Sequence, residues 1–572
     1  MPSSSPVETL HPPAGQKRQR TTAWVLAASV ALYLLALGFG SARHSGHLDI
    51  VLLLLQYGPI LVGATWYLRT QRITRGTAET ATLPRLNLLA VVACFALVAI
   101  PLSWFSTRGL LNPDESGYSF QARLYRSGRL MADPLVGATQ DVLKTPLELF
   151  YANHILRPYG WFPKFPPGWP LLLSLGYLIH ARWLPNAIFG TLQLFVIAAI
   201  GSRWFSRETG VLAALFAALS QFYLISSIGM MSHALCALLA ATACLALSAA
   251  ISTGKLRYYA AMFACLAGTF QVRPYTGFVL TFLLTCAALW FARKDQRLLI
   301  KVLGIGALFG ALAVAGVLIY DRIYTGHWLV SPYAEAAGGD TPPELSLGPA
   351  SVLRGVMRHG PFMLLETLLG AFPFLHLLAG YAIVQEKNHR REVWLLAALY
   401  LGLVLSYLAH PEGYAVFFGE RFHFEAFFAL ALLAARGTQL LVERWQIRRR
   451  TVGFALVVLA ALQIGQVAFA VQVVARRGEP YRKVREAVTN SNFSGVVFLH
   501  DSPGFIAKHF NLNDADWRHA PRVYLVDVEA DHRAEWACRY GFSHWLVASY
   551  DRRAHAAIVE PGETDCSAAK AP

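Results

Sequence analysis

The chain has 572 residues, 55% of them hydrophobic, with a mean hydropathy of +0.41 and a formal net charge of +16. This composition is too apolar for an ordinary soluble domain and predicts a polytopic membrane protein. The positive charge does not indicate a nucleic-acid-binding protein, because the basic residues separate apolar runs instead of gathering in one soluble segment.

The N-terminal segment, residues 1–21, is expected to be a cytoplasmic tail. It ends in three basic residues, Lys17, Arg18 and Arg20, and the first apolar run, Trp24 to Phe39, follows them. Further apolar runs come at once, and no small-x-small cleavage site ends the first. We therefore interpret this run as an uncleaved membrane anchor and not as a cleaved signal peptide.

Apolar runs near the ~20 residues needed to cross a bilayer recur along the chain. They predict about 13 transmembrane helices, at 22–40, 48–67, 86–106, 185–203, 209–228, 234–253, 258–272, 275–292, 298–320, 361–385, 393–409, 424–442 and 451–475. The apolar run from Gly168 to His180 is short for a span, and we expect a juxtamembrane or re-entrant helix there.

Basic clusters fall in every second connection between these spans, which is the positive-inside pattern. The pattern predicts a multi-pass protein of the cell inner (plasma) membrane with a cytoplasmic N-terminus and an extracytoplasmic C-terminus. Three spans (22–106) then precede a long extracytoplasmic loop (107–184), and the remaining spans form a second membrane unit (185–475). The loop carries Arg and Lys residues of its own, which departs from the strict rule.

The extracytoplasmic loop begins with a pair of acids, Asp114 and Glu115, in the segment Asn112-Pro113-Asp114-Glu115-Ser116-Gly117-Tyr118. Connections between packed helices are usually short, so a long loop with two acids near its start indicates an active-site element. The alternative is a pair of acids that caps the following helix, expected at Ser116 to Ser127. The two roles are compatible.

The composition after Arg476 is that of a small soluble module, residues 476–572. Short strands are predicted at Gly495 to His500, Val523 to Val528 and Trp545 to Ser549, and a helix at Tyr481 to Val488. We expect an extracytoplasmic α/β domain. Its two cysteines, Cys538 and Cys566, are free to pair in an oxidising compartment, whereas the other five cysteines lie in apolar runs.

A membrane enzyme on the outer face has few nucleotide donors within reach, and no Rossmann or P-loop fingerprint is present. A sugar linked to a lipid phosphate is the natural alternative donor. One ionised carboxylate supplies the general base for an attacking hydroxyl, and the leaving phosphate needs cations. Lys164, Arg273 and Arg421 each lie at a predicted outer membrane boundary. Anchoring at the lipid headgroups is the alternative for all three.

Several motifs resemble the GT-C membrane glycosyltransferases, in particular the group of protein O-mannosyltransferases and aminoarabinose transferases. They are Pro113-Asp114-Glu115-Ser116-Gly117-Tyr118, Lys164-Phe165-Pro166-Pro167-Gly168, Ser331-Pro332-Tyr333 and Gly419-Glu420-Arg421-Phe422. The resemblance implies an all-α GT-C type membrane domain, a polyprenyl-phosphate sugar donor and inversion at the anomeric carbon. It also implies that Asp114 is the catalytic base and that Glu115 orients the acceptor or the loop.

The acceptor is expected to be a glycan, a lipid or a protein, with membrane lipid as a further partner and no nucleic acid. No cofactor is expected. A divalent metal ion is compatible with the fold, but the sequence shows no ligand cage for one.

Other polar residues are weaker candidates for substrate contacts. Tyr118 and Arg123 share a face of the predicted loop helix with the acids, although helix packing uses such residues too. His233 begins a span, where a satisfied interfacial histidine is commoner. Glu366 lies within an apolar span, where an acid is costly and tends to mark function.

Two other functions compete with a glycosyltransferase. A secondary transporter favours inverted repeats and interrupted helices near mid-membrane, and the sequence shows neither. A polysaccharide polymerase or ligase would share lipid-linked substrates and is the second alternative.

Overall fold

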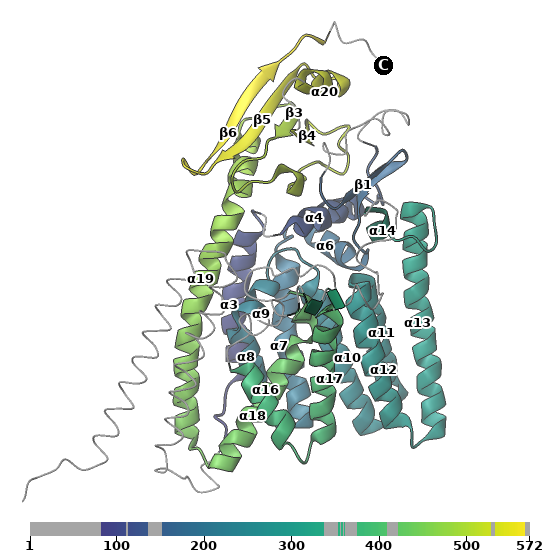
Figure 1. Ribbon diagram of the computed structural model, residues 1–572, viewed down its shortest axis with the longest axis vertical. Helices are drawn as coiled ribbons and strands as arrows, with labels where there is room; N and C mark the ends of the chain where they lie inside the picture. Colours follow the sequence, from purple (N-terminus) through teal and green to yellow (C-terminus); the bar gives the residue numbers. More distant parts are fainter. Residues whose placement is uncertain are drawn as a thin grey trace, which may run out of the picture.

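A computed structural model describes residues 82–109, 112–134, 151–336, 353–354, 356–357, 360, 374–408, 421–527 and 532–566. The predicted spans at 22–40 and 48–67, and most of that at 361–385, lie outside the described residues. A bundle of long helices carries a smaller domain at one end (Figure 1).

Seven stretches among the described residues are long and apolar enough to cross a membrane. They are α3 (Leu88–Ser106), α7 (Leu184–Trp204), α10 (His233–Thr253), α12 (Pro274–Ala292), α13 (Gln296–Thr325), α17 (Arg390–Leu408), and Arg421–Trp445, which joins η3 (Arg421–Ala426) to α18 (Phe427–Trp445). Shorter helices pack among them: α8 (Arg207–Leu219), α9 (Gln221–Ser226), α11 (Leu256–Val272) and α16 (Leu375–Gln385). A multi-span helical protein is thereby confirmed, whereas the number 13 is not.

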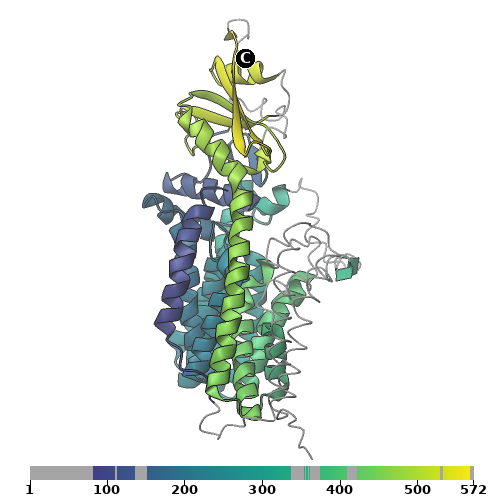
Figure 2. The same cartoon turned by 90° about the vertical axis from the view of Figure 1, so that its left-hand side faces the viewer.

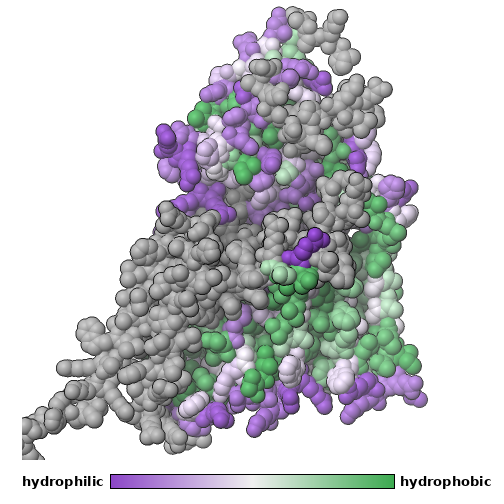
Figure 3. Space-filling view, viewed as in Figure 1, coloured by the Kyte–Doolittle hydropathy of each residue, from purple (hydrophilic) through white to green (hydrophobic). Residues whose placement is uncertain are grey.

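The surface of the bundle matches a lipid environment. Leu308 and Leu312 of α13 and Phe282 of α12 are all more than half exposed. Figure 3 shows such hydrophobic side chains as a belt between two hydrophilic ends. Burial in lipid accounts for this exposure, because contiguous apolar surface of this extent is unfavourable in water.

The predicted span at 209–228 is interrupted. Its helix ends at Leu219, and Ser220 has extended backbone (ψ 122°). The Ser220 side chain accepts a hydrogen bond from the Tyr223 amide and so caps the N-terminus of α9. A serine cap restarts the helix in a new direction, which the apolar pattern alone does not reveal.

The loop between α3 and α7 forms a layer over one end of the bundle. It contains α4 (Pro113–Arg126), the antiparallel hairpin of β1 (His154–Arg157) and β2 (Gly160–Pro163), and α6 (Gly168–Leu178). The short helix α14 (Pro332–Ala336) lies beside this layer (Figure 1). The expected short helix after Gly168 is therefore present as α6.

The longest helix among the described residues joins the helical bundle to the C-terminal domain without a break. Helix α19 (Arg449–Asn490) has 42 residues, about 63 Å of helix at 1.5 Å per residue, and includes the predicted helix at 481–488. Figure 2 shows it running the length of the bundle and entering the C-terminal domain.

The C-terminal domain is a four-stranded mixed sheet in the order β4-β3-β5-β6. The three predicted strands are confirmed as β3 (Gly495–Leu499), β4 (Arg522–Val526) and β5 (His544–Asp551), and β6 (Ala556–Glu563) was not predicted. Strand β3 is central and fully buried, and its Val497 lies between Tyr524 of β4 and Leu546 of β5. The elements η4 (Ala507–His509) and α20 (Arg533–Arg539) complete the domain. Cys538 and Cys566, whose pairing the sequence permits, form a disulfide.

Helix α4 is held between two hydrophobic cores. Tyr118 and Ala122, four residues apart, pack on a cluster with α6 and α10. Phe120 and Leu124, also four residues apart, pack into the core of the C-terminal domain. Residues at this spacing lie one above the other on a helix, so the two pairs occupy different faces. The helix that carries the acid pair is thus fixed on both sides.

Candidate active site

The acid pair lies in the first turn of α4. The side chain of Asn112 caps this helix by accepting a hydrogen bond from the Asp114 amide (2.9 Å), and Pro113 occupies its first turn. The predicted start at Ser116 is therefore three residues late. Because Asn112 provides the cap, both carboxylates are available for contacts with other parts of the chain, while the helix dipole favours their charge.

Asp114 is held at both of its oxygens. Asn153 donates from Nδ2 to Oδ1 (3.1 Å), and Arg421 donates from its guanidinium to Oδ2 (3.1 Å). The Asp114 side chain keeps 21% of its surface exposed. A carboxylate with fixed orientation and access from outside suits a group that must take a proton from a bound substrate.

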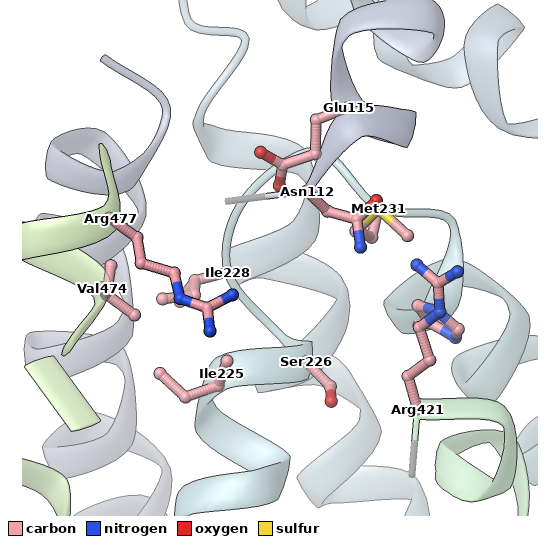
Figure 4. Close-up of a pocket in the computed structure, with 10 residues that line it drawn as sticks. Asn112, Glu115, Ile225, Ser226, Ile228, Met231, Arg421, Val474 and Arg477 are labelled. Atoms are coloured by element: carbon pink, nitrogen blue, oxygen red, sulfur yellow. The ribbon is translucent and has the colours of Figure 1, made fainter. Parts of the chain in front are cut away.

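Glu115 has a different environment. It is completely buried, and its Oε1 accepts a hydrogen bond from the Met230 amide (2.8 Å), just before α10. Figure 4 shows the Glu115 side chain extending downward from α4 at the upper edge of a pocket. This contact ties the start of α4 to the membrane domain, which suits the predicted orienting role.

Lys164 and Asp114 are linked through Asn153. The Lys164 amide donates to the carbonyl of Asn153 (3.0 Å), while the side chain of Asn153 reaches Asp114. The Lys164 ammonium lies 5.0 Å from the ring centre of Tyr333 in α14. Among the ion pairs of the described residues none involves Lys164, so this cation is the best placed of the three predicted ones to meet an anion.

A second acid that the sequence analysis missed lies on the other side of Tyr118. Glu425 is fully buried, and its Oε1 is 2.8 Å from Nδ1 of His233 and 3.1 Å from Nε of Arg273. Arg273 also donates to the Ser232 hydroxyl (3.3 Å), which lies 3.1 Å from the hydroxyl of Tyr118. Glu425 lies in an apolar run. The criterion that singled out Glu366, an acid within an apolar span, would therefore have found Glu425 too.

Tyr118 connects these groups to the loop. Its ring stacks on Phe165 at 4.1 Å, the residue after Lys164. The adjacent Gly117 permits this approach, since a Cβ there would lie 2.5 Å from the Phe165 ring. Burial raises the pKa of Tyr118 to about 12, with smaller effects from Arg273 and Asp114. The phenol therefore stays neutral and acts as a hydrogen-bonding group.

One predicted site residue, Arg123, is not brought to this centre, and another cannot be placed. Arg123 points into the C-terminal domain and donates to the carbonyl of Asn513 (2.9 Å). Glu366 lies outside the described residues. The remaining residues converge from α4, the hairpin, α10, the start of α12 and η3.

A cavity of about 50 Å³ opens beside the acid pair. Figure 4 shows Glu115 above it, with Arg421 on one side and Arg477 of α19 on the other. Its floor is apolar and includes Ile225 and Ile228. Within the described part of the chain, no group of three or more His, Cys, Asp or Glu side chains is arranged to hold a metal ion.

Comparisons with known proteins support the class of enzyme. Residues 164–320 match the sequence model of a family described as dolichyl-phosphate-mannose-protein mannosyltransferase. No curated protein sequence matches the chain. The match confirms the resemblance stated above, and the chain is a membrane glycosyltransferase that depends on a lipid-phosphate-linked sugar.

The fold resembles that of a solved oligosaccharyltransferase. The apo oligosaccharyltransferase of Archaeoglobus fulgidus superposes with a TM-score of 0.51 at 14% identity, over 80% of this chain and 69% of that one. ArnT from Cupriavidus metallidurans, bound to undecaprenyl phosphate, gives a TM-score of 0.48 at 13% identity, over 84% of this chain and 98% of that one.

Proposed function

We propose that the chain transfers a sugar from a polyprenyl-phosphate donor to an acceptor hydroxyl on the extracytoplasmic face, with inversion at the anomeric carbon. The observation that carries this proposal is the linkage of Asp114 to Lys164 through Asn153. Two hydrogen bonds thereby connect the segment of the proton acceptor to that of the cation, and attack on a phosphate-linked sugar requires both groups.

In the proposed reaction, Asp114 takes the proton of the acceptor hydroxyl as its oxygen attacks the anomeric carbon. The new carbon–oxygen bond forms on the face opposite the donor phosphate, and the bond to the phosphate oxygen breaks. This single displacement inverts the configuration. The polyprenyl phosphate leaves as an anion, so no general acid is needed.

Lys164 neutralises the developing charge on the leaving phosphate. The Tyr333 ring beside it supports the ammonium through a cation–π contact and limits where the side chain can move. Arg421 is committed to Asp114 in this structure, so it orients the base and is available to the donor phosphate only if that pair opens. Arg273 is compensated by Glu425 and acts mainly by positioning Ser232 and Tyr118.

The acceptor class is best tested in cells. A deletion strain should lack one glycan or glycolipid modification in mass spectrometry, and the wild-type chain should restore it. Complementation with Asp114→Asn should not. Asp133→Asn, which alters a half-exposed acid of the same loop, is the control. Full restoration by Asp114→Asn would reject Asp114 as the base.

We propose separately that the Asp114 centre and the C-terminal domain lie on the extracytoplasmic face of the membrane. Since α4 and the C-terminal domain share one hydrophobic core, both must lie on the same side. The positive-inside pattern of the basic clusters supports the proposal that this side is outside. An alkaline phosphatase fused to the C-terminus should therefore be active. An inactive fusion with a fluorescent cytoplasmic reporter at the same position would reverse the topology.

A further inference from the structure

A second cavity lies at the opposite end of α4 from the acid pair. It has a volume of about 330 Å³ and is lined by Trp104, Thr107, Arg108, Arg126, Tyr177, His180, Arg182 and Trp183. Arg126 is the last residue of α4, twelve positions after Asp114, which corresponds to about 18 Å along the helix. We call it the arginine cavity, and its lining is distinct from that of the cavity beside Asp114.

The lining is basic and lacks a carboxylate. Three arginines line the cavity, and no ion pair among the described residues involves any of them. Arg182 donates to the carbonyl of Thr107 (3.1 Å), and Arg108 lies 3.6 Å from the ring centre of Trp104. These contacts fix the side chains but leave their charge uncompensated.

Two more arginines increase the positive charge around the cavity. Arg485 of α19 donates to the carbonyl of Arg108 (3.2 Å). Burial, and then the charges of Arg182 and Arg123, lower the pKa of Arg485 to about 9. Asp514, an acid whose charge acts on Arg123, is exposed. The positive charges of these guanidinium groups repel one another, and an anion between them would offset this repulsion.

The surface next to the cavity is apolar. Trp104, Leu178 and Ile179 are 43%, 53% and 65% exposed, at the ends of α3 and α6. Trp183 at the start of α7 also lines the cavity. Tryptophans beside arginines at the end of a span are typical of the level of the lipid headgroups. An occupant therefore has an anionic head in the cavity and apolar chains along this surface.

We propose that the arginine cavity binds the phosphate group of an anionic membrane lipid, at a site separate from the Asp114 centre. Interfacial arginines commonly extend to the headgroups one by one. Here three of them line a single hollow with two tryptophans and no acid. The site also accounts for basic residues in a loop where the positive-inside rule would exclude them.

The test uses the full chain in detergent and native mass spectrometry. Three probes are titrated: phosphatidate, diacylglycerol with the same acyl chains, and inorganic phosphate. The variants are Arg108→Gln and Arg126→Gln, which change exposed side chains of the cavity. Arg129→Gln is the control, since Arg129 lies three residues after Arg126, pairs with Asp133 and Asp516, and does not line the cavity.

We expect phosphatidate to bind wild type and Arg129→Gln equally and each cavity variant about 10-fold or more weakly, the effect of losing one charge-assisted contact. Equal thermal stability of all four proteins shows that the variants are folded. Unchanged phosphatidate binding in both cavity variants, or equal binding of diacylglycerol to wild type, would overturn the proposal. Inorganic phosphate that binds as tightly as phosphatidate would assign the site to free phosphate and overturn the lipid source.

Discussion

Replacing Asp114 with asparagine is the most direct test of the proposed mechanism. The substitution keeps the size of the side chain and one oxygen for Asn153 or Arg421, but it removes the basicity. General-base catalysis contributes about 10²- to 10⁴-fold. Transfer should therefore fall by about 100-fold or more, equivalent to at least about 2.7 kcal/mol in the activation barrier.

The substitution should cost less in folding stability than in the activation barrier, and the two effects can be measured separately. Asp114 loses one charge-assisted hydrogen bond to Arg421 and keeps a neutral one. Such bonds contribute about 1.5–3 kcal/mol when charged and about 1 kcal/mol when neutral, so the loss is about 0.5–2 kcal/mol. The helix itself remains capped by Asn112 and packed between two cores. The variant should remain folded.

The assay is initial-rate sugar transfer from a polyprenyl-phosphate donor by purified protein, with size-exclusion chromatography of each variant. Asp133→Asn should transfer at the wild-type rate. Glu115→Gln should lose less activity than Asp114→Asn, because a glutamine oxygen still accepts from the Met230 amide. Near-normal turnover by monodisperse Asp114→Asn would refute the mechanism.

Three other predictions follow from the contacts around this centre. Lys164→Ala should raise the KM for the donor by about 10-fold with little change in the KM for the acceptor. Lys508→Ala, which changes an exposed lysine, should alter neither KM. A raised KM for the acceptor alone would reassign Lys164. Reducing the disulfide, which spans 28 residues, should destabilise the C-terminal domain by about 3–4 kcal/mol in the chain-entropy treatment. Thiol labelling of both Cys538 and Cys566 in unreduced protein would show that they are unpaired. Burial lowers the pKa of His154, which bonds Asn511 of the C-terminal domain, to about 4. Its stabilising contribution is therefore complete above pH 6.5 and is lost as the pH falls toward 4, so proteolysis of the domain should accelerate over that range in wild type and less in His154→Gln.

The sequence determined the local features of this protein. Apolar runs of sufficient length predicted the membrane helices, because a span must be apolar over about 20 consecutive residues. Alternating and buried runs predicted three of the four strands in the C-terminal domain, and Cys538 and Cys566 were the only pair available there. The acid pair was found from its place at the start of a long loop.

The sequence did not determine which distant residues would meet. The partner of Asp114 is Arg421, 307 positions away, and Glu425 meets His233 across 192. Composition and periodicity describe the neighbours of a residue along the chain, whereas these pairs depend on how η3 packs against α10 and on where α4 lies above them. The same limit applied to Arg123, whose helical face was predicted but whose partner in the C-terminal domain was not.

The role of the C-terminal domain also depended on tertiary structure. Its strands predicted a separate module, yet its hydrophobic core includes Phe120 and Leu124 of α4, and α19 enters it without a break. Burial of apolar surface drives this packing without regard to position in the chain. The acid pair was therefore visible in the sequence, whereas the two cores that hold it in place arose only when the folded chain brought them together.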